Sequence, residues 1–445
     1  MKPHGILLLS FAAALAATAR ADSLTTLPDS IDLSTAVHYA LDHSYPIREA
    51  REQIRQQEGV ILQVKSQEIP NVDATGLYQR NAAAVSTFSP PETALWEIQV
   101  KATQAIYAGG GIAASVKGAR LSRDAALLSL QAVVNAALLD VRTKFYGVIL
   151  AREQVKVQED NVKLAERELV DTQNQFHAGA VSNFEVLRAR VALANAQPDL
   201  ITARNNERIA IEQLRQALGV PSGIGTTGSF TSVAGGLDIT TEAVETDAAL
   251  TSAHQNRPEL LQLGKLHEAA EQSVVVAKST YYPTLSAFGA YEWGGENFNA
   301  TNSAAGGSGT ANGWLAGLQS NWAIFDGRST AGKVEQAVAV SSQEQLAYDA
   351  EELAIDVEVR QALSTLQEAG ELVEASRQTV GQADEALRLA RERYRAGSAT
   401  QLDVLTSETS LTQTRTNQLQ ANYNYLVAVA ALRKAMGLAD AQIRN

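Results

Sequence analysis

Two stretches of the chain carry apolar residues at a strict spacing of seven. In the first stretch these positions are Leu127, Val134, Val141, Val148, Val155, Val162, Leu169 and Phe176. In the second they are Val359, Leu366, Val373, Val380, Leu387 and Tyr394. A sustained repeat of seven is typical of α-helices that coil around neighbouring helices along one apolar seam. We therefore predict two very long helices, over residues 112–178 and 329–396.

Shorter helices are predicted on both sides of each long one. Residues 34–68 and 182–218 flank the first long helix, and residues 247–280 and 400–436 flank the second. At about 1.5 Å per residue, a helix over residues 112–178 is roughly 100 Å long. The two shorter helices of each half together reach nearly the same length. We expect them to stack end to end beside the long helix, so that each chain supplies four helical columns.

Between the first short helix and the long helix of each half, the apolar period changes from seven to two. This change predicts strands at 70–80, 94–106, 283–293 and 314–324. In the second of them Trp96, Ile98, Val100, Ala102 and Ile106 alternate with Glu97, Gln99, Lys101 and Thr103. A barrel strand between lipid and an aqueous lumen shows such alternation, and so does a half-buried strand of a soluble sheet. The alternation alone leaves both interpretations open.

The aromatic residues favour membrane strands. All four tryptophans lie in the predicted strands, namely Trp96, Trp293, Trp314 and Trp322. Amphipathic rings gather at the headgroup level of a bilayer, so these tryptophans are predicted to face lipid. Four strands cannot close a transmembrane barrel, which needs about 8, and open edges are not tolerated in lipid. The chain must therefore oligomerise, and a dimer and a trimer remain the simplest options.

The sequence contains an internal repeat of one structural unit. Residues 176–187 match residues 394–405 at an offset of 218, and the same offset carries Gly109 onto Gly327 and Gly219 onto Gly437. A repeat of this length is too long for a solenoid unit and indicates a duplicated half. The boundaries that follow are a first structural repeat at 22–218, a connector at 219–247, a second repeat at 248–437 and a tail at 438–445.

The first 21 residues have the layout of a cleaved secretory signal. Lys2 precedes an apolar run over 6–17, and small-x-small sites end at Ala19 and Ala21, either of which allows cleavage. Removing the signal takes the formal net charge from −12 to −14, because it carries Lys2 and Arg20 and no acid. Such an acidic chain is a poor candidate for nucleic-acid binding. No later segment is expected to approach the roughly 18 apolar residues of a transmembrane helix.

The remaining chemistry is sparse. The chain has no cysteine, which excludes disulfides, thiolate metal sites and an acylated N-terminal Cys. Its six histidines have no ligand-type spacing, and no G-x-S-x-G nucleophile motif occurs. The triplet 109–111 is Gly-Gly-Gly without a following Lys-Ser/Thr, which argues against a phosphate site. We expect no enzyme, no cofactor and no metal, so energy for any transport must come from a partner.

With these features the sequence resembles the TolC or outer membrane factor family over nearly the whole mature chain. The resemblance rests on the duplicated half, the strand starts at Pro70 and Pro283, the strand-to-helix junctions at 106–110 and 324–327, and the turns around Gly179 and Gly397. The turn motif, present twice at the same offset, is the most specific of these.

The resemblance implies a mainly α fold with a membrane β-barrel. Three chains would form a 12-stranded barrel in the outer membrane and a 12-column helical barrel across the periplasm. The implied function is a passive exit duct of a tripartite efflux or type I secretion system. Its partners would be outer-membrane lipid, a periplasmic adaptor (membrane fusion) protein and an inner-membrane transporter. The transported substrate is not implied.

The resemblance also suggests functional residues at the periplasmic end. Gly179 and Gly397 would form the tip turns that meet the adaptor. Asp403 matches a pore-facing carboxylate of the family, Glu185 is its counterpart in the first half, and Tyr394 matches an aromatic at the end of the long helix. A solvated carboxylate at a helix start explains Asp403 equally simply.

The sequence departs from the family pattern at two nearby positions. Thr406 stands where a second acid can occur, and Ala399 stands where a tethering Arg can occur. Both departures argue against a double acidic ring and an Arg-based latch. The alternative to a duct is a periplasmic coiled-coil structural or adhesive protein that transports nothing. It explains the heptads and the signal, but neither the clustered tryptophans nor the duplicated turn.

Overall fold

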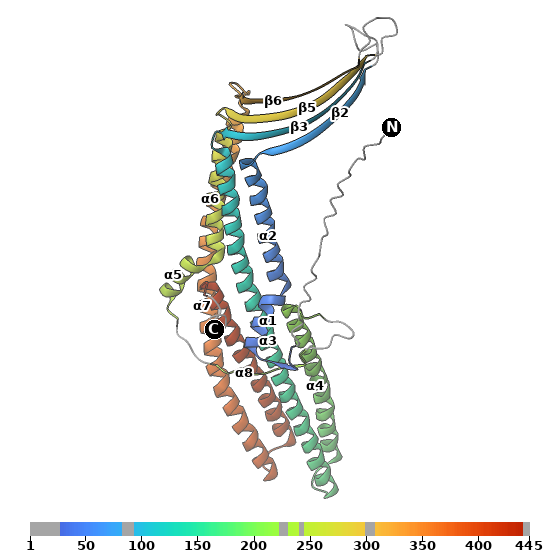
Figure 1. Cartoon of the computed structure of the whole chain (residues 1–445). Coiled ribbons are helices and arrows are strands. Elements are labelled where there is room, and N and C mark those ends of the chain that lie inside the picture. The colour runs from blue at the N-terminus through green and yellow to red at the C-terminus, as the bar shows by residue number, and fades with distance from the viewer. Residues whose placement is uncertain (1–26, 82–92, 222–229, 240–243, 299–307, 439–445) are drawn as a thin grey trace, which may run out of the picture.

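The computed structural model describes residues 27–81, 93–221, 230–239, 244–298 and 308–438. The predicted signal at 1–21 and the tail beyond Leu438 lie outside the described residues, as do parts of the predicted connector. The described chain is a long bundle of helices that carries one curved sheet at its end (Figure 1).

The helices follow the predicted order. They are α1 (Leu33–His43), α2 (Tyr45–Lys65), α3 (Gly111–His177), α4 (Asn183–Leu218), α5 (Thr246–Asn256), α6 (Pro258–Ser279), α7 (Ser329–Arg395) and α8 (Gln401–Ala435), with a 3-10 turn η1 (Ser66–Glu68) after α2. The bounds of α3, α4, α7 and α8 agree with the prediction to within one residue. The prediction of both long helices from the heptad pattern is therefore confirmed.

The prediction of single helices over 34–68 and 247–280 is wrong, because each segment is two helices. Pro46 lies in the first turn of α2, and Pro258 is the first residue of α6. Proline lacks a backbone N–H and is favoured in the first turn of a helix, and each of these two prolines lies at the start of a new helix. Ser44 and Arg257, with ψ of 128° and 115°, are the extended residues at the two breaks.

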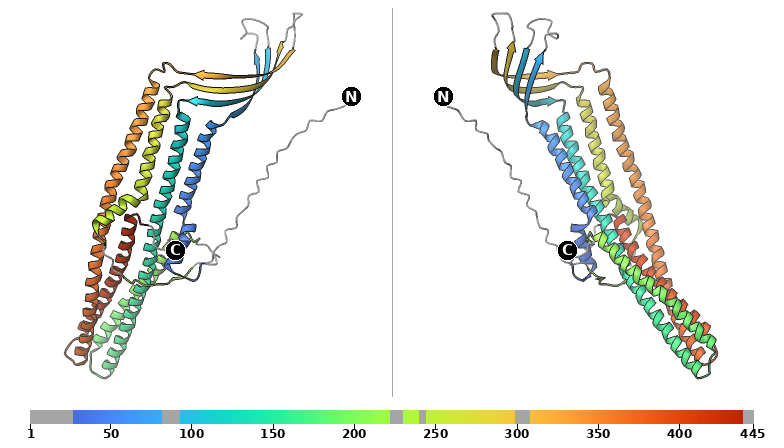
Figure 2. Two further views of the ribbon diagram at one scale, coloured as in Figure 1. Left: turned by 60° about the vertical axis from the view of Figure 1, so that its left-hand side comes forward. Right: turned by 90° about the vertical axis from the view of Figure 1, so that its right-hand side faces the viewer.

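The helices form stacked columns (Figure 2). Helix α3 packs against α2 and α4 on one side and against α6 and α8 on the other, while α7 packs against α6 and α8. Together α2 and α4, with 21 and 36 residues, are shorter than α3, which has 67 residues. The reason is that α1 lies beside the column at mid-length and does not extend it. The same holds for α5, which packs on α7.

The sheet is antiparallel, with strand order β2-β3-β5-β6. Its strands are β2 (Asn71–Asn81), β3 (Thr93–Ala108), β5 (Thr284–Phe298) and β6 (Ser308–Asn321). The central β3–β5 pair joins the two halves of the chain. A second, two-residue pairing of β1 (Ser30–Ile31) with β4 (Ser232–Val233) is parallel and ties the connector to the N-terminal segment.

The largest buried cluster lies at the middle of the rod, around α1, α3, the end of α4 and the connector. Among its bulkiest members are Phe145, Phe230, Ile149 and Leu214, all at most 2% exposed. Smaller clusters follow α7 and α8 towards the far end. The chain is therefore held by a series of small helical cores, as expected for supercoiled columns.

One described helix, α3, contains a window of 18 residues that is apolar enough by composition to cross a membrane. The expectation that no segment after the signal approaches this limit is therefore wrong for α3. At roughly 100 Å the helix is far longer than a bilayer is thick. Only 17% of the window is buried within the chain, and we interpret the rest as surface for packing against other helices.

Candidate functional site

Two helix turns lie side by side at the end of the molecule opposite the sheet, and we call residues 178–182 and 396–400 together the tip (Figure 2). Gly179 and Gly397 have φ of 75° and 73°. In each turn the glycine N–H bonds to the carbonyl three residues earlier, and the next N–H bonds to the carbonyl five residues earlier, at 2.8–2.9 Å. A Cβ added to either glycine would meet open space. Glycine is therefore required here by the left-handed backbone conformation and not by crowding.

Asp403 closes the first turn of α8. Its Oδ2 accepts hydrogen bonds from the backbone N–H and the hydroxyl of Thr400, both at 2.8 Å, and its own N–H donates to Thr400 Oγ1 at 3.3 Å. This is a capping box. The backbone and side-chain hydrogen bonds from Thr400 hold the pKa of Asp403 below its usual value. The carboxylate therefore stays charged and has a local structural role.

A buried junction joins the start of α8 to α3 and α4. Gln401 and Thr172 are 2% and 1% exposed. In the orientation of the Gln401 amide that satisfies its neighbours, Oε1 accepts from the Thr172 hydroxyl at 2.9 Å. Its Nε2 donates to the Glu185 carbonyl oxygen at 3.3 Å and to Glu185 Oε2 at 2.5 Å. Arg188 Nη1 also lies 3.3 Å from Glu185 Oε2, so this one carboxylate oxygen contacts both Gln401 and Arg188.

Tyr394 makes a second link between the two helix pairs. Its hydroxyl donates to Gln175 Oε1 on α3 at 3.1 Å. Burial, with smaller contributions from the negative charges of Glu168 and Glu185, raises the pKa of the Tyr394 phenol, which stays neutral and able to donate. The ring packs against the small cluster of Ala383, Leu387, Val404 and Leu411. The tip is therefore a packed structure within one chain.

One ion pair close to the tip has a buried carboxylate. Glu408 on α8 has a side chain 7% exposed, and its Oε1 lies 3.0 Å from Arg391 Nη2 on α7. Burial raises the pKa of Glu408, and the hydrogen bond and charge of Arg391 only partly oppose it. The pair fixes α7 to α8 at a cost in desolvation.

The predicted site residues thus fall into two groups. Glu185 and Tyr394 lie close enough for the Glu185 charge to affect the Tyr394 phenol, whereas the Asp403 side chain accepts hydrogen bonds from Thr400. Sequence reasoning missed Gln401, which connects α8 to α3 and α4. An amide recurs at this place, since Asn183 corresponds to Gln401 at the offset of 218, and that repetition was the available signal.

At the other end of the molecule, the cross-strand register gathers the apolar residues on one side of the sheet. Tyr78 pairs with Trp96, Val100 with Tyr291, and Tyr291 with Trp314. Residues opposite each other in register project to the same face. We call this side the aromatic face; its members are Tyr78, Trp96, Ile98, Val100, Tyr291, Trp293, Trp314, Ala316 and Leu318.

The opposite side of the sheet, the polar face, carries Glu97, Gln99, Lys101 and Thr103 of β3. Gln99 Nε2 donates to Glu292 Oε1 on β5. The ammonium of Lys101 lies 5.3 Å from the centre of the Phe288 ring. Polar side chains of neighbouring strands therefore contact each other on this face, and the predicted alternation of β3 is confirmed from Trp96 to Thr103.

The predicted place of Ile106 in this alternation is wrong. A bulge lies between residues 105 and 107, so Ile106 has no partner on β5. Beyond the bulge Tyr107, opposite Leu285, occupies the aromatic face instead. A bulge inserts one extra residue and so changes the side to which the following residues point.

Trp322 was also predicted within the last strand, and the structure places it outside. β6 ends at Asn321, which pairs with Thr284, the first residue of β5 after Pro283. Beyond that pair Trp322 has no partner strand within the described ranges, and its Nε1 donates to the Tyr281 carbonyl at 3.1 Å. Trp96, Trp293 and Trp314 lie in strands; contact of any tryptophan with lipid stays a prediction.

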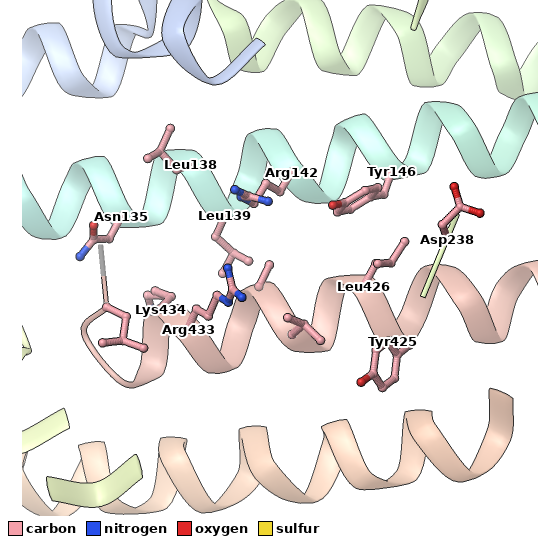
Figure 3. A pocket seen from close by; sticks show the side chains of 13 residues that line it. Asn135, Leu138, Leu139, Arg142, Tyr146, Asp238, Tyr425, Leu426, Arg433 and Lys434 are labelled. Atoms are coloured by element: carbon pink, nitrogen blue, oxygen red, sulfur yellow. The ribbon is translucent and has the colours of Figure 1, made fainter. Parts of the chain in front are cut away.

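A cavity of about 230 Å³ lies between α3 and α8 at mid-length (Figure 3). It is lined by polar side chains, among them Asn135, Arg142, Asp238, Arg433 and Lys434, and by several leucines. Within the part of the chain that the structure describes, no group of three or more His, Asp or Glu could hold a metal ion.

Comparison with known proteins adds independent findings. The profile of the family described as outer membrane efflux protein matches residues 36–220 and 249–438. The chain is 24% identical to the outer membrane protein TolC of Escherichia coli (strain K12) over 316 residues, which are 68% of this chain and 62% of that protein. It is 24% identical to the cobalt-zinc-cadmium resistance protein CzcC of Cupriavidus metallidurans over 87% of this chain and 86% of that protein.

Among solved structures, CusC superposes with a TM-score of 0.76 at 17% identity, covering 92% of both chains. At this identity the likeness concerns the fold alone. The two matched segments of the family profile cover most of the chain and correspond to its two halves.

Proposed function

The chain belongs to the outer membrane efflux protein family, and from this premise we propose that it is the outer-membrane exit duct of a tripartite efflux or type I secretion system. Three copies form the duct, which conducts substrates passively from the periplasm to the exterior. A periplasmic adaptor and an inner-membrane transporter dock to it and supply the energy. The TolC-like relatives and the fold support this proposal.

The observation that carries the proposal is the pair of open sheet edges. β2 and β6 are the outer strands, and each pairs with one neighbour in the described chain. An open edge in a bilayer leaves backbone groups unsatisfied, which costs several kcal/mol per group. Pairing β6 of one copy with β2 of the next removes both edges. Three copies then close a barrel of 12 strands, within the range of known transmembrane barrels.

Apolar side chains on the two flanks of the helical layer support the same assembly. On α7, Leu346 and Leu353 are 66% and 68% exposed and stand seven residues apart. On α4, which packs mainly against α3, Val191 and Ile201 are 58% and 68% exposed. Long exposed apolar stripes mark interfaces in soluble helices. We propose that α7 of one copy packs against the α2–α4 column of the next.

We further propose that the duct narrows at the tip. Asp403, Glu185 and Tyr394 are the candidate constriction residues, and the turns at Gly179 and Gly397 are the candidate docking surface for the adaptor. Three copies of Asp403 around a threefold axis would form a single ring of negative charge. Such a ring attracts cations in a narrow pore. The hydrogen bonds of Tyr394 and Gln401 to α3 and α4 then hold α7 and α8 in the closed position.

The domain arrangement that goes with this function is also a proposal. Residues 1–21 are removed on export, and 22–218 and 248–437 are the two structural repeats. The connector at 219–247 lies around the middle of the helical barrel, and 438–445 is a short tail. The aromatic face of the sheet contacts lipid, and its polar face lines the lumen.

Two measurements test the proposal. Light scattering of the detergent-solubilised protein should give a stable trimer, and the trimer should conduct ions in planar bilayers. A folded, monodisperse monomer would contradict the barrel. A trimer without conductance would instead favour the alternative of a structural coiled-coil protein that transports nothing.

A further inference from the structure

The second helical column has a joint at mid-length, which we define as the break at 256–258, the end of α8 at 432–437 and the facing part of α7 at 355–359. Gly437 ends α8 with φ of 67°. A Cβ added to Gly437 would lie 2.6 Å from the carbonyl carbon of Asn256. The end of α8 therefore touches the backbone between α5 and α6.

Arg257 ties the three parts of this joint together. Its side chain is 4% exposed, and its Nη1 lies 2.7 Å from Glu358 Oε2 on α7. Nη1 also donates to the Ala435 carbonyl at the end of α8, at 3.4 Å, and Nε donates to Glu259 on α6 at 3.0 Å. Glu358 Oε1 in turn lies 3.1 Å from Lys434 Nζ on α8. One buried guanidinium thus contacts α6, α7 and α8.

The corresponding joint of the first column is held differently. Gly219 packs against the His43 carbonyl just as Gly437 packs against Asn256. The residue that matches Arg257 is Tyr45, which is 63% exposed. The large apolar cluster around Phe145 and Phe230 holds that joint instead. Of the buried polar side chains in the described ranges, Arg257 alone is cationic.

On its other side, the end of α8 borders a cavity. The cavity of about 230 Å³ separates its last turns from α3, and Figure 3 shows Arg433 and Lys434 of α8 across from Arg142 of α3. The cluster that buries Ala435 on the side of the joint is small, with Ala249 and Ala253 among its members. Apolar packing of Tyr425, Ala428 and Leu432 against α7 holds the two helices together. The polar contacts of Arg257 tie this α7–α8 pair to the break between α5 and α6.

We propose that Arg257, acting through Glu358 and the end of α8, is a positioning residue for the gate at the tip. The 35 residues of α8 make a lever of roughly 52 Å between the joint and the tip. A rotation of about 5° at the joint moves the far end by roughly 4–5 Å. The Arg257–Glu358 ion pair favours one angle of α8 at the joint, and weakening the pair allows other angles. This inference rests on the proposed function only where it assigns the moving end to a pore.

The test measures the tip directly and needs no transport. The chain has no cysteine, so spin labels attach only where cysteines are introduced. Ala178 and Ala396 are exposed, correspond at the offset of 218 and belong to the two tip turns. A spin label on each, in trimers diluted with unlabelled chain, reports the distance between the α3–α4 and α7–α8 turns by double electron–electron resonance. Single-channel conductance of the same trimers is recorded in parallel.

Arg257→Gln and Glu358→Gln are each expected to move or broaden the distance distribution by about 3–5 Å and to raise the open-channel fraction. Lys434→Met, which keeps the Arg257–Glu358 pair, should give a smaller shift and serves if the first two variants fail to assemble. The control is Arg388→Gln, which removes the same charge from α7 at an exposed pair with Glu385 and should change neither readout.

A lowered unfolding temperature with tip distances like those of the wild type would overturn the proposal, because Arg257 would then only stabilise the fold. Shifts of the same size in Arg388→Gln would also overturn it. If the distances respond but no variant and no wild-type trimer conducts, the joint acts as proposed and the function as a duct is wrong. The two failures are thus separable.

Discussion

Leu315 and Leu318 stand three residues apart on β6 and project to opposite faces of the sheet. Leu318 pairs with Ala287 on the aromatic face, and Leu315 pairs with Ala290 on the polar face. Leu315 is 38% exposed and Leu318 is 69% exposed. The two leucines allow the same substitution, Leu→Arg, to be made on the proposed lipid side and on the proposed lumen side of one strand.

The strand geometry places both residues near the middle of the membrane. Leu318 is three residues and Leu315 six residues from Asn321, where β6 ends. A rise of about 3.4 Å per residue and a tilt of roughly 40° give about 2.6 Å per residue along the membrane normal. In an apolar band roughly 25 Å tall, the residues then lie about 8 Å and 16 Å from its helical edge, on either side of the midplane.

The expected free energies differ because lipid cannot solvate a guanidinium. Leu318→Arg should cost about 2–3 kcal/mol per chain, and roughly 6–9 kcal/mol for a trimer that carries three copies. Leu315→Arg places the guanidinium in water and should cost about 0.5 kcal/mol or less. The difference should be measurable by urea titration of folding into liposomes, and as a loss of assembled trimer in outer-membrane fractions.

Equal midpoints for the two variants would refute the assignment of faces. A larger loss for Leu315→Arg would show that the sheet is turned the other way, with its aromatic face towards the lumen. Leu318→Gln and Leu315→Gln provide the uncharged controls, since each removes the leucine from the same position without adding a charge.

Three other predictions follow from the helical part. Asp403→Asn should lower cation preference in single-channel recordings and Glu185→Gln should lower it less; unchanged selectivity would remove Asp403 from the constriction. Glu408→Gln should leave the unfolding temperature equal or higher at pH 7. Arg391→Gln leaves the buried carboxylate unpaired and should cost up to about 3 kcal/mol in thermal unfolding. A greater loss of stability in Glu408→Gln than in Arg391→Gln would contradict the role of burial. Lys434 and Arg257 outweigh burial and hold the pKa of Glu358 below its ordinary 4.5, so its contribution to stability is present above that pH and is lost as the pH falls through the lowered pKa. The unfolding temperatures of wild type and Glu358→Gln should therefore converge below pH 4.5, and a constant gap down to pH 3 would be inconsistent with this.

The sequence by itself determined the elements whose signals are local and periodic. The heptads predicted the long helices α3 and α7, because a seam that repeats every seven residues is typical of long supercoiled helices. Gly179 and Gly397 predicted the turns, because glycine alone adopts φ near 75° at little cost. The alternation in β3 predicted which residues share a face as far as Thr103, because side chains alternate with period two along any strand.

Only the tertiary structure decided what depends on partners distant in the chain. Trp322 lies outside β6 because the facing strand begins only after Pro283, and a pattern within one strand contains no information about its neighbour. Gln401 reads as a polar residue at a helix start, yet it is buried because α3 and α4 close over it. The sequence shows Arg257 only as a charged residue before a proline. Its contacts with Glu358 and Ala435 arise only when α6, α7 and α8 meet. The energy of a buried polar group depends on the partners that replace its water, and packing alone supplies them.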